Sequence, residues 1–431
     1  MAKLLVKNFG PIASGCNSDD GFIDVKQCSV FVGPQGSGKS CIVKLISLFS
    51  WLEKSLSVGN VQEKIDKNMF IAKLEYHGIQ GFINNDTVLE YKGDAYDFSF
   101  KNDQFKSVKI NGKYVRPKIL YIPADRSFCT AIKNPGKITG LPENTFEFLI
   151  DFTDAELGLN KQLYSIPING FSFSYEEEKK QAYLLDEKEK YKIEISSASS
   201  GILSSLPLTL TTAYYSGFLS IRPMNKSLDK LQEMYSDALE RLNRLQISMD
   251  EIKDGASELS TSEIRQKKEK ISKISKELLE LKTYVKRPGE AVSEIINSRL
   301  INIVEEPEQN LFPEAQADVL YYLIKCMNSG NVLGGKNSLV ITTHSPYVIE
   351  ALNNSMYAKR LIASGKSINN LLETNELVSY DDVAAYKLKD GVIESIKDET
   401  LKQIDAGYLD SCSERIRNLY GKLEDIDFSN E

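Results

Sequence analysis

The chain has 431 residues, with 53 Lys and Arg against 60 Asp and Glu, and a formal net charge of -7 at pH 7. This length allows two or three domains, or one large domain with insertions, and can bury a sizeable core. With 42% hydrophobic and 26% charged residues, the composition is typical of a soluble protein. The acidic balance excludes a surface coated in positive charge, so nucleic-acid binding would need a local basic patch.

The six cysteines are scattered, and none forms a Cys-x-x-Cys pair, so we expect free thiols in a reducing compartment and no zinc site. No apolar run reaches the roughly 20 residues that a membrane span needs. The N-terminus MAKLLVKNFGPI lacks the apolar core and cleavage site of a secretory signal. We therefore expect a cytoplasmic protein that does not associate with membranes.

The chain opens with an alternating run, LLVKNFG, that predicts a strand. A β-rich run over 29–32 then meets GPQGSGKS, which is followed by an amphipathic helix pattern. This matches G-x-x-x-x-G-K-[ST] in the strand and helix context that a phosphate-binding loop requires. In such a loop, backbone N–H groups surround phosphate oxygens, the lysine reaches the β and γ phosphates, and the serine binds Mg²⁺. The predicted nucleotide-binding residues are Gly33, Pro34, Gln35, Gly36, Ser37, Gly38, Lys39, Ser40 and Cys41, with Ser40 also a metal ligand.

Residues 70–115 contain five short β-like runs separated by turn signals, which predict an antiparallel meander. The runs are FIAKLEY, GIQGFI, TVLEY, YDFSF and SVKI. We assign a structural role to His77, which lies between the first two runs. The segment therefore predicts an antiparallel β lobe.

The apolar run over 119–122 predicts a buried parallel strand, after which Asp125 and Arg126 emerge. Ligands bind at the carboxyl ends of strands in open α/β sheets, so both residues are site candidates. The alternative is a surface salt bridge between them.

Residues 128–195 predict no chemistry, although FSFSYEEEKKQAYLLDEKEKYKIEIS is typical of two or three strands with charged turns. The next segment, SSASSG over 196–201, stands directly before a helix pattern. Small hydroxyl residues and a glycine at a helix N-terminus can bind an anion. Taken alone, a simple serine N-cap explains the same residues.

Between 226 and 287, apolar residues recur three and four apart in two series separated by Asp-Gly-Ala-Ser. This spacing predicts an antiparallel coiled-coil hairpin with arms of about 25 residues, or roughly 37 Å. Its lysines between 267 and 276 either meet an acidic partner or form a solvated helical face.

Two further apolar runs, over 300–304 and 339–342, end in chemically active residues. The first is followed by Glu305 and Glu306, an arrangement suited to nucleotide hydrolysis, in which one acid holds Mg²⁺ through water and the other deprotonates the attacking water. The second is followed by Thr343 and His344, one of only two histidines in the chain. We therefore expect Glu305 to be a metal ligand and Glu306 to be catalytic.

In this order, GPQGSGKS, SSASSG, VEEPEQNLFP and TTHSP resemble the motifs of the ABC-type ATPases of the SMC, RecF and OLD group, over most of residues 1–360. The resemblance implies an α/β P-loop NTPase head with an inserted antiparallel β lobe and a coiled-coil hairpin. The head would comprise residues 1–225 and 288–431, with the hairpin at 226–287. ATP and Mg²⁺ are the implied cofactors.

The resemblance also implies roles for individual residues. Gly33 to Ser40 match the Walker A motif, and Ser199, Ser200 and Gly201 match the signature sequence, which closes over ATP held by another subunit. Glu305 and Glu306 match the Walker B acids, and His344 matches the switch histidine. The strand before Arg126 resembles the Q-loop strand, which makes Arg126 a candidate nucleotide contact.

Several features depart from the usual pattern of this group. Glu305 stands where aspartate is usual, Gln309 and Asn310 stand where an Ala-His pair is frequent, and the signature lacks the usual LSGG. The predicted hairpin follows the signature, whereas the long coil of SMC proteins precedes it. The departures indicate the compact ATPases of anti-phage defence operons. The AriA-type ATPases of PARIS systems are most similar, and the ATPases of Septu-like or retron systems are the nearest alternative.

After His344 the sequence predicts two strands and a helical tail over 408–423, with no carboxylate cluster typical of a nuclease. The resemblance thus implies a homo-oligomeric ATPase that restrains a separately encoded Toprim-like nuclease until a phage trigger protein, such as an anti-restriction protein, is sensed. One alternative is a RecF-like repair ATPase that binds DNA. Another is an assembly protein that binds nucleotide without hydrolysis, which Glu306 and His344 together disfavour.

Overall fold

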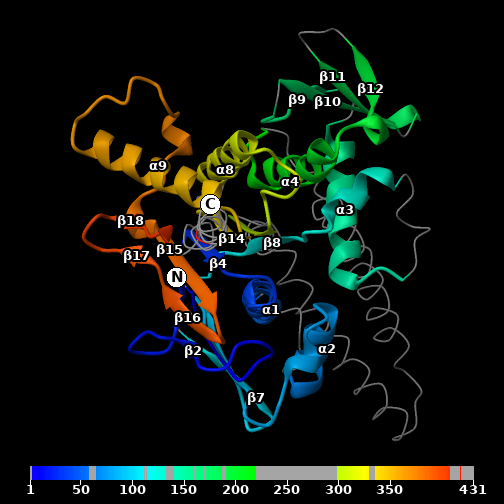
Figure 1. Ribbon diagram of the computed structural model, residues 1–431. Helices are drawn as coiled ribbons and strands as arrows, with labels where there is room; N and C mark the ends of the chain where they lie inside the picture. The colour runs from blue at the N-terminus through cyan, green and yellow to red at the C-terminus, as the bar shows by residue number, and fades with distance from the viewer. Residues whose placement is uncertain are drawn as a thin grey trace, which may run out of the picture. The chain divides into compact units, whose positions relative to one another are not determined.

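The computed structural model describes residues 2–57, 65–110, 112, 114–132, 140–159, 162–168, 170–179, 181–186, 191–219, 299–329, 335–407 and 418. The chain divides into two units, Met1–Pro223 with Ser298–Glu431, and Met224–Asn297. The hairpin predicted for 226–287 lies outside the described residues, as does the tail predicted for 408–423 apart from Asn418. The described residues belong to the first unit, which combines α-helices with parallel and antiparallel sheets (Figure 1).

The centre of this unit is a seven-stranded sheet in the order β2-β16-β15-β4-β14-β13-β8. Five adjacent strands run parallel: β15 (Val383–Lys389), β4 (Cys28–Val32), β14 (Ser338–Thr343), β13 (Arg299–Glu305) and β8 (Pro117–Ile122). At one edge, β16 (Val392–Ser395) pairs antiparallel with β15, and β2 (Gly15–Cys16) pairs with β16. Strands buried on both faces of a parallel sheet have continuous apolar sequences. The four strands predicted from such runs, β4, β8, β13 and β14, are confirmed.

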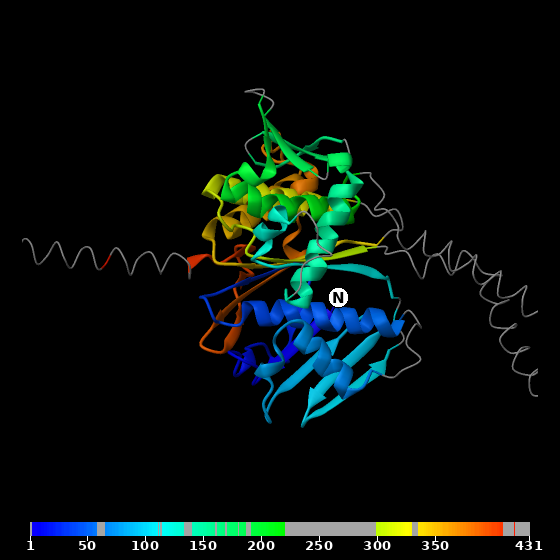
Figure 2. The ribbon, with the colours of Figure 1, turned by 90° about the vertical axis from the view of Figure 1, so that its right-hand side faces the viewer.

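Side chains of the central strands alternate between two apolar cores, one on each face of the sheet. Val30 and Ile341 belong to the core shared with the helices of one face, whereas Phe31 and Val340 belong to the core shared with α1 (Lys39–Ser57). The helices of the first face are α3 (Glu143–Gly158), α4 (Ser200–Ser216), α8 (Pro313–Asn328) and α9 (Pro346–Ala363). Figure 2 shows these helices on one side of the sheet and α1 on the other.

A five-stranded antiparallel sheet packs on the far side of α1, in the order β3-β1-β5-β6-β7. Its strands are β1 (Ala2–Lys7), β3 (Ile23–Val25), β5 (Val88–Lys92), β6 (Tyr96–Lys101) and β7 (Gln104–Lys109). The predicted first strand and the last three runs of the meander are therefore confirmed. All neighbours in this sheet run antiparallel.

The first two runs of the predicted meander are not strands. FIAKLEY lies in helix α2 (Lys67–Tyr76), and GIQGFI contains the short 3-10 turn Gln80–Phe82. Asp66 starts the helix by accepting a hydrogen bond from the backbone N–H of Met69, at 2.9 Å. Phe70 and Leu74 are both buried and stand four residues apart, the spacing of one helix face. The N-cap and this spacing outweigh the β propensity of the run.

The strands predicted within 128–195 are confirmed as part of a four-stranded sheet, ordered β12-β11-β10-β9. They are β9 (Tyr164–Ser165), β10 (Phe171–Glu176), β11 (Gln181–Asp186) and β12 (Lys192–Glu194). Helix α3, in the same stretch, was not predicted. The two strands predicted after His344 are β15 and β16, and the short pair β17 (Lys397–Asp398) and β18 (Gln403–Ile404) follows them. Among the described residues, no helix combines the length and the apolar character needed to cross a membrane.

Candidate functional site

The loop between β4 and α1 adopts a backbone that glycine alone allows at several positions. Gly36 and Gly38 have φ values of 75° and 101°, in the left-handed region. A Cβ atom at Gly33 would lie 2.3 Å from the carbonyl oxygen of Leu388, and one at Gly38 would lie 2.9 Å from Cγ1 of Ile12. The loop therefore has the strand before it, the helix after it and the glycine requirement that the motif predicts.

Lys39 is the first residue of α1, and its side chain turns back into this loop. Its Nζ donates hydrogen bonds to the carbonyl oxygens of Gly33, at 2.9 Å, and Pro34, at 3.0 Å. Only 5% of Lys39 is exposed, and burial lowers the pKa of its ammonium group, while nearby carboxylates, that of Glu306 foremost, oppose this shift. The loop thus holds the ammonium group of Lys39 against two backbone carbonyl oxygens.

Ser40 and Glu305, predicted as the two metal ligands, are in direct contact. The Ser40 hydroxyl donates to Oε2 of Glu305 at 3.0 Å, and Glu305 ends β13 with 8% exposure. The other carboxylate oxygen, Oε1, accepts a hydrogen bond from the hydroxyl of Tyr121 on β8. Burial and the charge of Glu305 raise the pKa of Tyr121 well above its ordinary value, so this hydroxyl stays a donor. Tyr121 holds the acid in place and was not predicted.

These side chains fit a magnesium nucleotide. A serine hydroxyl and one carboxylate are hard oxygen ligands, and Mg²⁺ commonly takes only one or two protein carboxylates and completes its shell with phosphates and water. Among the described residues, no group of three or more His, Cys, Asp and Glu residues could hold a metal by itself. Within the loop, the Ser37 hydroxyl is buried and lacks a hydrogen-bond partner in the described structure.

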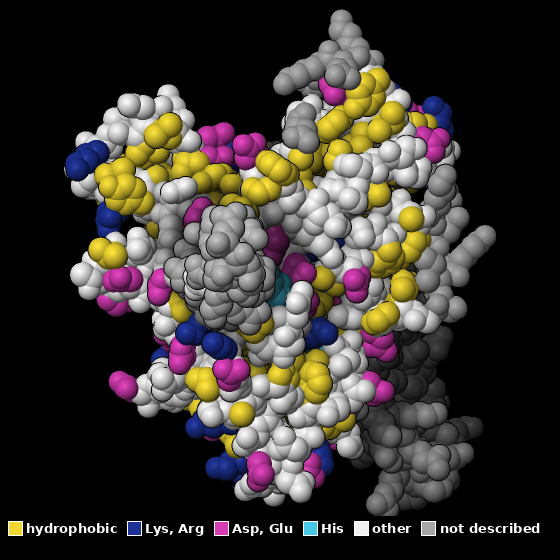
Figure 3. Space-filling view, in the orientation of Figure 1, with side chains coloured by type: hydrophobic (Ala, Val, Ile, Leu, Met, Phe, Trp, Pro, Cys, Tyr) yellow, Lys and Arg dark blue, Asp and Glu magenta, His cyan; other side chains and the backbone are white. Residues whose placement is uncertain are grey.

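The two residues predicted as catalytic, Glu306 and His344, lie side by side at the ends of the neighbouring strands β13 and β14. His344 Nε2 is 3.3 Å from Oε1 of Glu306, with 29% and 35% of their side chains exposed. Contact with His344 is the main reason that the pKa of Glu306 lies below its ordinary value. Figure 3 shows histidine and acidic side chains together in a hollow on the face that is turned to the viewer. Glu306 is thus an ionised, solvent-accessible carboxylate beside Lys39 and Glu305.

Arg126 does not contact this open region, which corrects its prediction as a nucleotide contact. The residue is fully buried, and its Nε donates to the carbonyl oxygen of Ser204 on α4 at 2.8 Å. Its terminal nitrogens donate to the carbonyl oxygens of Glu305, at 2.6 Å, and Glu306, at 2.8 Å. Burial lowers the pKa of Arg126 to about 10, so it stays charged at neutral pH. Asp125 is exposed, so a surface salt bridge does not describe the pair either.

The predicted signature residues stand at the start of α4. Ser199 is the N-cap residue, yet its side chain makes no capping hydrogen bond, and Ser199 and Ser200 are both exposed. A Cβ atom at Gly201 would lie 2.9 Å from the carbonyl oxygen of Asn310, so Gly201 packs against the loop that follows β13 in the same chain. The plain serine N-cap therefore does not explain this segment.

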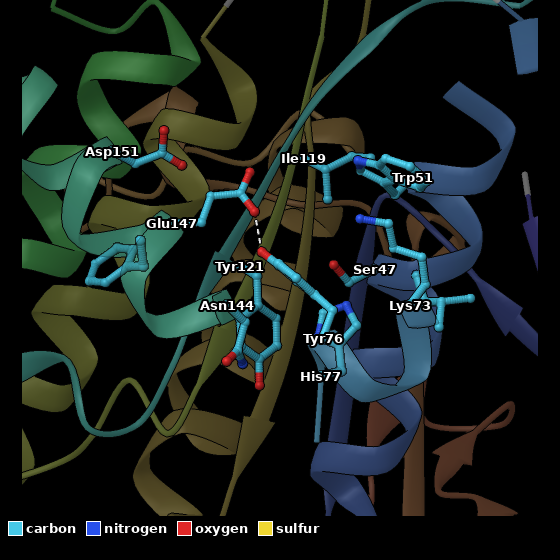
Figure 4. A pocket seen from close by; sticks show the side chains of 12 residues that line it. Ser47, Trp51, Lys73, Tyr76, His77, Ile119, Tyr121, Asn144, Glu147 and Asp151 are labelled. Atoms are coloured by element: carbon cyan, nitrogen blue, oxygen red, sulfur yellow. Dashed lines mark hydrogen bonds between the residues drawn. The ribbon is translucent and has the colours of Figure 1, made fainter. Parts of the chain in front are cut away.

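A separate cavity of about 50 Å³ lies between α1, α2, β8 and α3, where Tyr76 and Glu147 are joined by a hydrogen bond (Figure 4). His77 lines it and is 4% exposed. Burial lowers the pKa of His77 to about 3, so its ring stays neutral, and it packs edge-on against Tyr121 with ring centres 5.5 Å apart. These contacts agree with the structural role predicted for His77.

The chain was compared with protein-family models and with curated proteins. No protein-family model matches the chain, and no curated protein matches it significantly.

Proposed function

We propose that the chain is a magnesium-dependent ATPase with an ABC-type P-loop head. The observation that carries the proposal is the meeting of three predicted elements at one edge of the sheet: the lysine loop, the Ser40–Glu305 pair and the Glu306–His344 pair. These come from three adjacent parallel strands, whose carboxyl ends form the usual ligand-binding edge of an α/β sheet. Their polar atoms match the phosphates, the metal ion and the attacking water of nucleotide hydrolysis.

In this proposal each side chain has one role. Residues 33–41 bind the triphosphate through backbone N–H groups, and Lys39 stabilises charge on the β and γ oxygens. Ser40 and Glu305 hold Mg²⁺, which when bound neutralises phosphate charge. Glu306 accepts the proton of the attacking water, a role suited to a carboxylate that is ionised at neutral pH. His344 orients the Glu306 carboxylate through their contact.

We further propose that two heads pair, so that the chain is a dimer or a larger homo-oligomer. Ser199 and Ser200 are exposed at a helix N-terminus and are not used as caps, which leaves them available to the nucleotide of a second copy. This arrangement would make each hydrolytic site depend on two chains.

The biological role we propose is that of a cytoplasmic sensor in an anti-phage system of the PARIS type. ATP binding would order the paired heads, and this state would hold a separately encoded Toprim-like nuclease until a phage trigger protein favours a second state. The motif order and its departures support this role.

The test uses the purified full chain. Wild type and Lys39→Ala are assayed for phosphate release with ATP and Mg²⁺, and wild type is then incubated with plasmid, tRNA, Mn²⁺ or Mg²⁺, and ATP. We expect wild type, but not Lys39→Ala, to hydrolyse ATP. Plasmid and tRNA should stay intact with the purified chain, and be cleaved only after a nuclease encoded by a neighbouring gene and its trigger are added. Cleavage by the chain alone would contradict the sensor role. Tight, salt-sensitive DNA binding would instead favour the RecF-like alternative.

A further inference from the structure

Glu308 links the ends of two neighbouring strands at the proposed hydrolytic site. It follows β13, yet its Oε1 accepts two hydrogen bonds from the residues that end β14. The donors are the Thr343 hydroxyl, at 2.8 Å, and the backbone N–H of His344, at 2.7 Å. One carboxylate oxygen therefore fixes the backbone from which the His344 side chain departs.

A second link joins the same two strand ends from the opposite direction. The backbone N–H of Glu306 donates to the carbonyl oxygen of Thr342 at 2.9 Å. Glu306 is thus held to β14 by its own backbone, while His344 is held to the loop after β13 by Glu308. The 3.3 Å contact between the two side chains lies between these links. A carboxylate accepting two hydrogen bonds is a stronger link than a neutral acceptor.

The other oxygen of Glu308 gives an independent reason to assign it a role. Oε2 is buried and has no hydrogen-bond partner in the described part of the chain. An unpaired buried polar atom destabilises a fold, and burial raises the pKa of the Glu308 carboxyl above its ordinary value. A smaller or apolar side chain here would leave the Thr343 hydroxyl and the His344 N–H without this acceptor. The carboxylate is explained by what Oε1 holds in place.

We infer that Glu308 is a positioning residue for hydrolysis, which holds the backbone of His344 so that its ring reaches Glu306. This inference rests on the proposed ATPase function. It assigns Glu308 no contact with the nucleotide, the metal or the attacking water. Its effect on turnover must therefore pass through His344.

The experiment measures kcat and KM for ATP in Glu308→Ala and Glu308→Gln, each made in the wild-type and the His344→Ala backgrounds. In the wild-type background we expect Glu308→Ala to lower kcat about 10- to 100-fold, with KM changed less than about twofold. Glu308→Gln should keep kcat within about threefold, because its amide oxygen accepts the same two hydrogen bonds. In the His344→Ala background, Glu308→Ala should lower kcat by less than about twofold further.

Thr343→Ala gives a second route if Glu308→Ala does not fold, since it removes one of the two donors. We expect a smaller loss of kcat that also disappears in the His344→Ala background. An unchanged kcat in Glu308→Ala, or an equal loss with and without His344, would overturn the inference while leaving the ATPase proposal intact. Absence of ATP hydrolysis by wild type would overturn the proposed function, and the inference with it.

Discussion

Two regions of the molecule carry the predicted nucleotide chemistry, and they differ in how their polar groups are used. At the strand ends, Lys39, Ser40 and Glu305 are all hydrogen-bonded within the chain. At the start of α4, Ser199 and Ser200 are exposed, and Ser199 makes no capping bond. The first region is complete in one chain, whereas the second presents its side chains outward. This contrast is what a site divided between two subunits requires.

Arg126 connects the two regions. Its guanidinium bonds to the backbone of Glu305 and Glu306 on one side and to Ser204 of α4 on the other. The carbonyl oxygens it satisfies belong to segments far apart in the sequence. The guanidinium therefore links the strand ends to α4 by hydrogen bonds.

The largest effect should come from Lys39→Ala, which removes the cation of the strand-end region. We expect loss of at least about 100-fold in ATP turnover, because the lysine stabilises charge that grows on the phosphate oxygens. Phosphate release is the measurement, with Lys44→Ala, one turn along α1, as the matched control. Unchanged turnover in Lys39→Ala would remove the phosphate-loop assignment.

Glu306→Gln should separate binding from hydrolysis within the same region. The amide fills the same volume but cannot accept a proton, so we expect ATP to bind normally and turnover to fall about 100-fold or more. Retention of labelled ATP by the variant is measured alongside Glu305→Gln, which should weaken Mg²⁺-dependent binding instead. If Glu305→Gln were the variant that retains ATP without hydrolysis, our order of the two acids would be wrong.

The start of α4 is tested by Ser199→Arg, which should block hydrolysis at least about tenfold without affecting ATP binding, because the bulk faces a neighbouring subunit. Gly201→Arg should also block hydrolysis, but it disturbs its own chain, since Gly201 lies against Asn310. The decisive measurement is the ATP turnover of a mixture of two variant chains. When the Ser199→Arg chain is mixed with the Lys39→Ala chain, turnover should recover. A mixed dimer contains one site in which both the lysine of one chain and the serine of the other are intact. Normal turnover in Ser199→Arg, or no recovery on mixing, would contradict the divided site.

The smallest effect on turnover should come from Arg126→Lys, which tests the connection between the regions. Lysine keeps the charge but cannot reproduce the planar set of donors, so at least one buried carbonyl loses its partner. We expect about 2 kcal/mol less stability and a several-fold lower turnover. Chemical denaturation measures the stability and phosphate release measures the turnover, and Lys366→Arg, at an exposed position, is the control. An unchanged unfolding midpoint would show that the guanidinium contacts contribute little.

The sequence predicted the strand-end region well because of how parallel strands are built. Each interior strand leaves a continuous apolar run, and the residue after the run falls at the ligand-binding edge. Glu306 and His344 each follow such a run, so both were expected at the end of a strand, whereas their contact was not predicted. The alternating and turn-bounded runs of the two antiparallel sheets were nearly as informative.

Other features depend on the alignment of strands that are far apart in the sequence. Tyr121 reaches Glu305, and Glu308 reaches His344, only because β8, β13 and β14 pair in one register. Arg126 was misassigned because position after a strand does not reveal whether a side chain points outward or into the protein. Helix α2 was mistaken for a strand because its apolar residues are dense enough to suit either structure.

The backbone of Glu306 is strained. Its φ value is 45°, a left-handed backbone that costs a residue with a Cβ atom about 1 kcal/mol or more. Glycine would relieve that strain, so Glu306→Gly is a substitution that should make the fold more stable while removing the carboxylate. The free energy of unfolding of this variant, measured against that of wild type, therefore gives the cost to the fold of a side chain at this position.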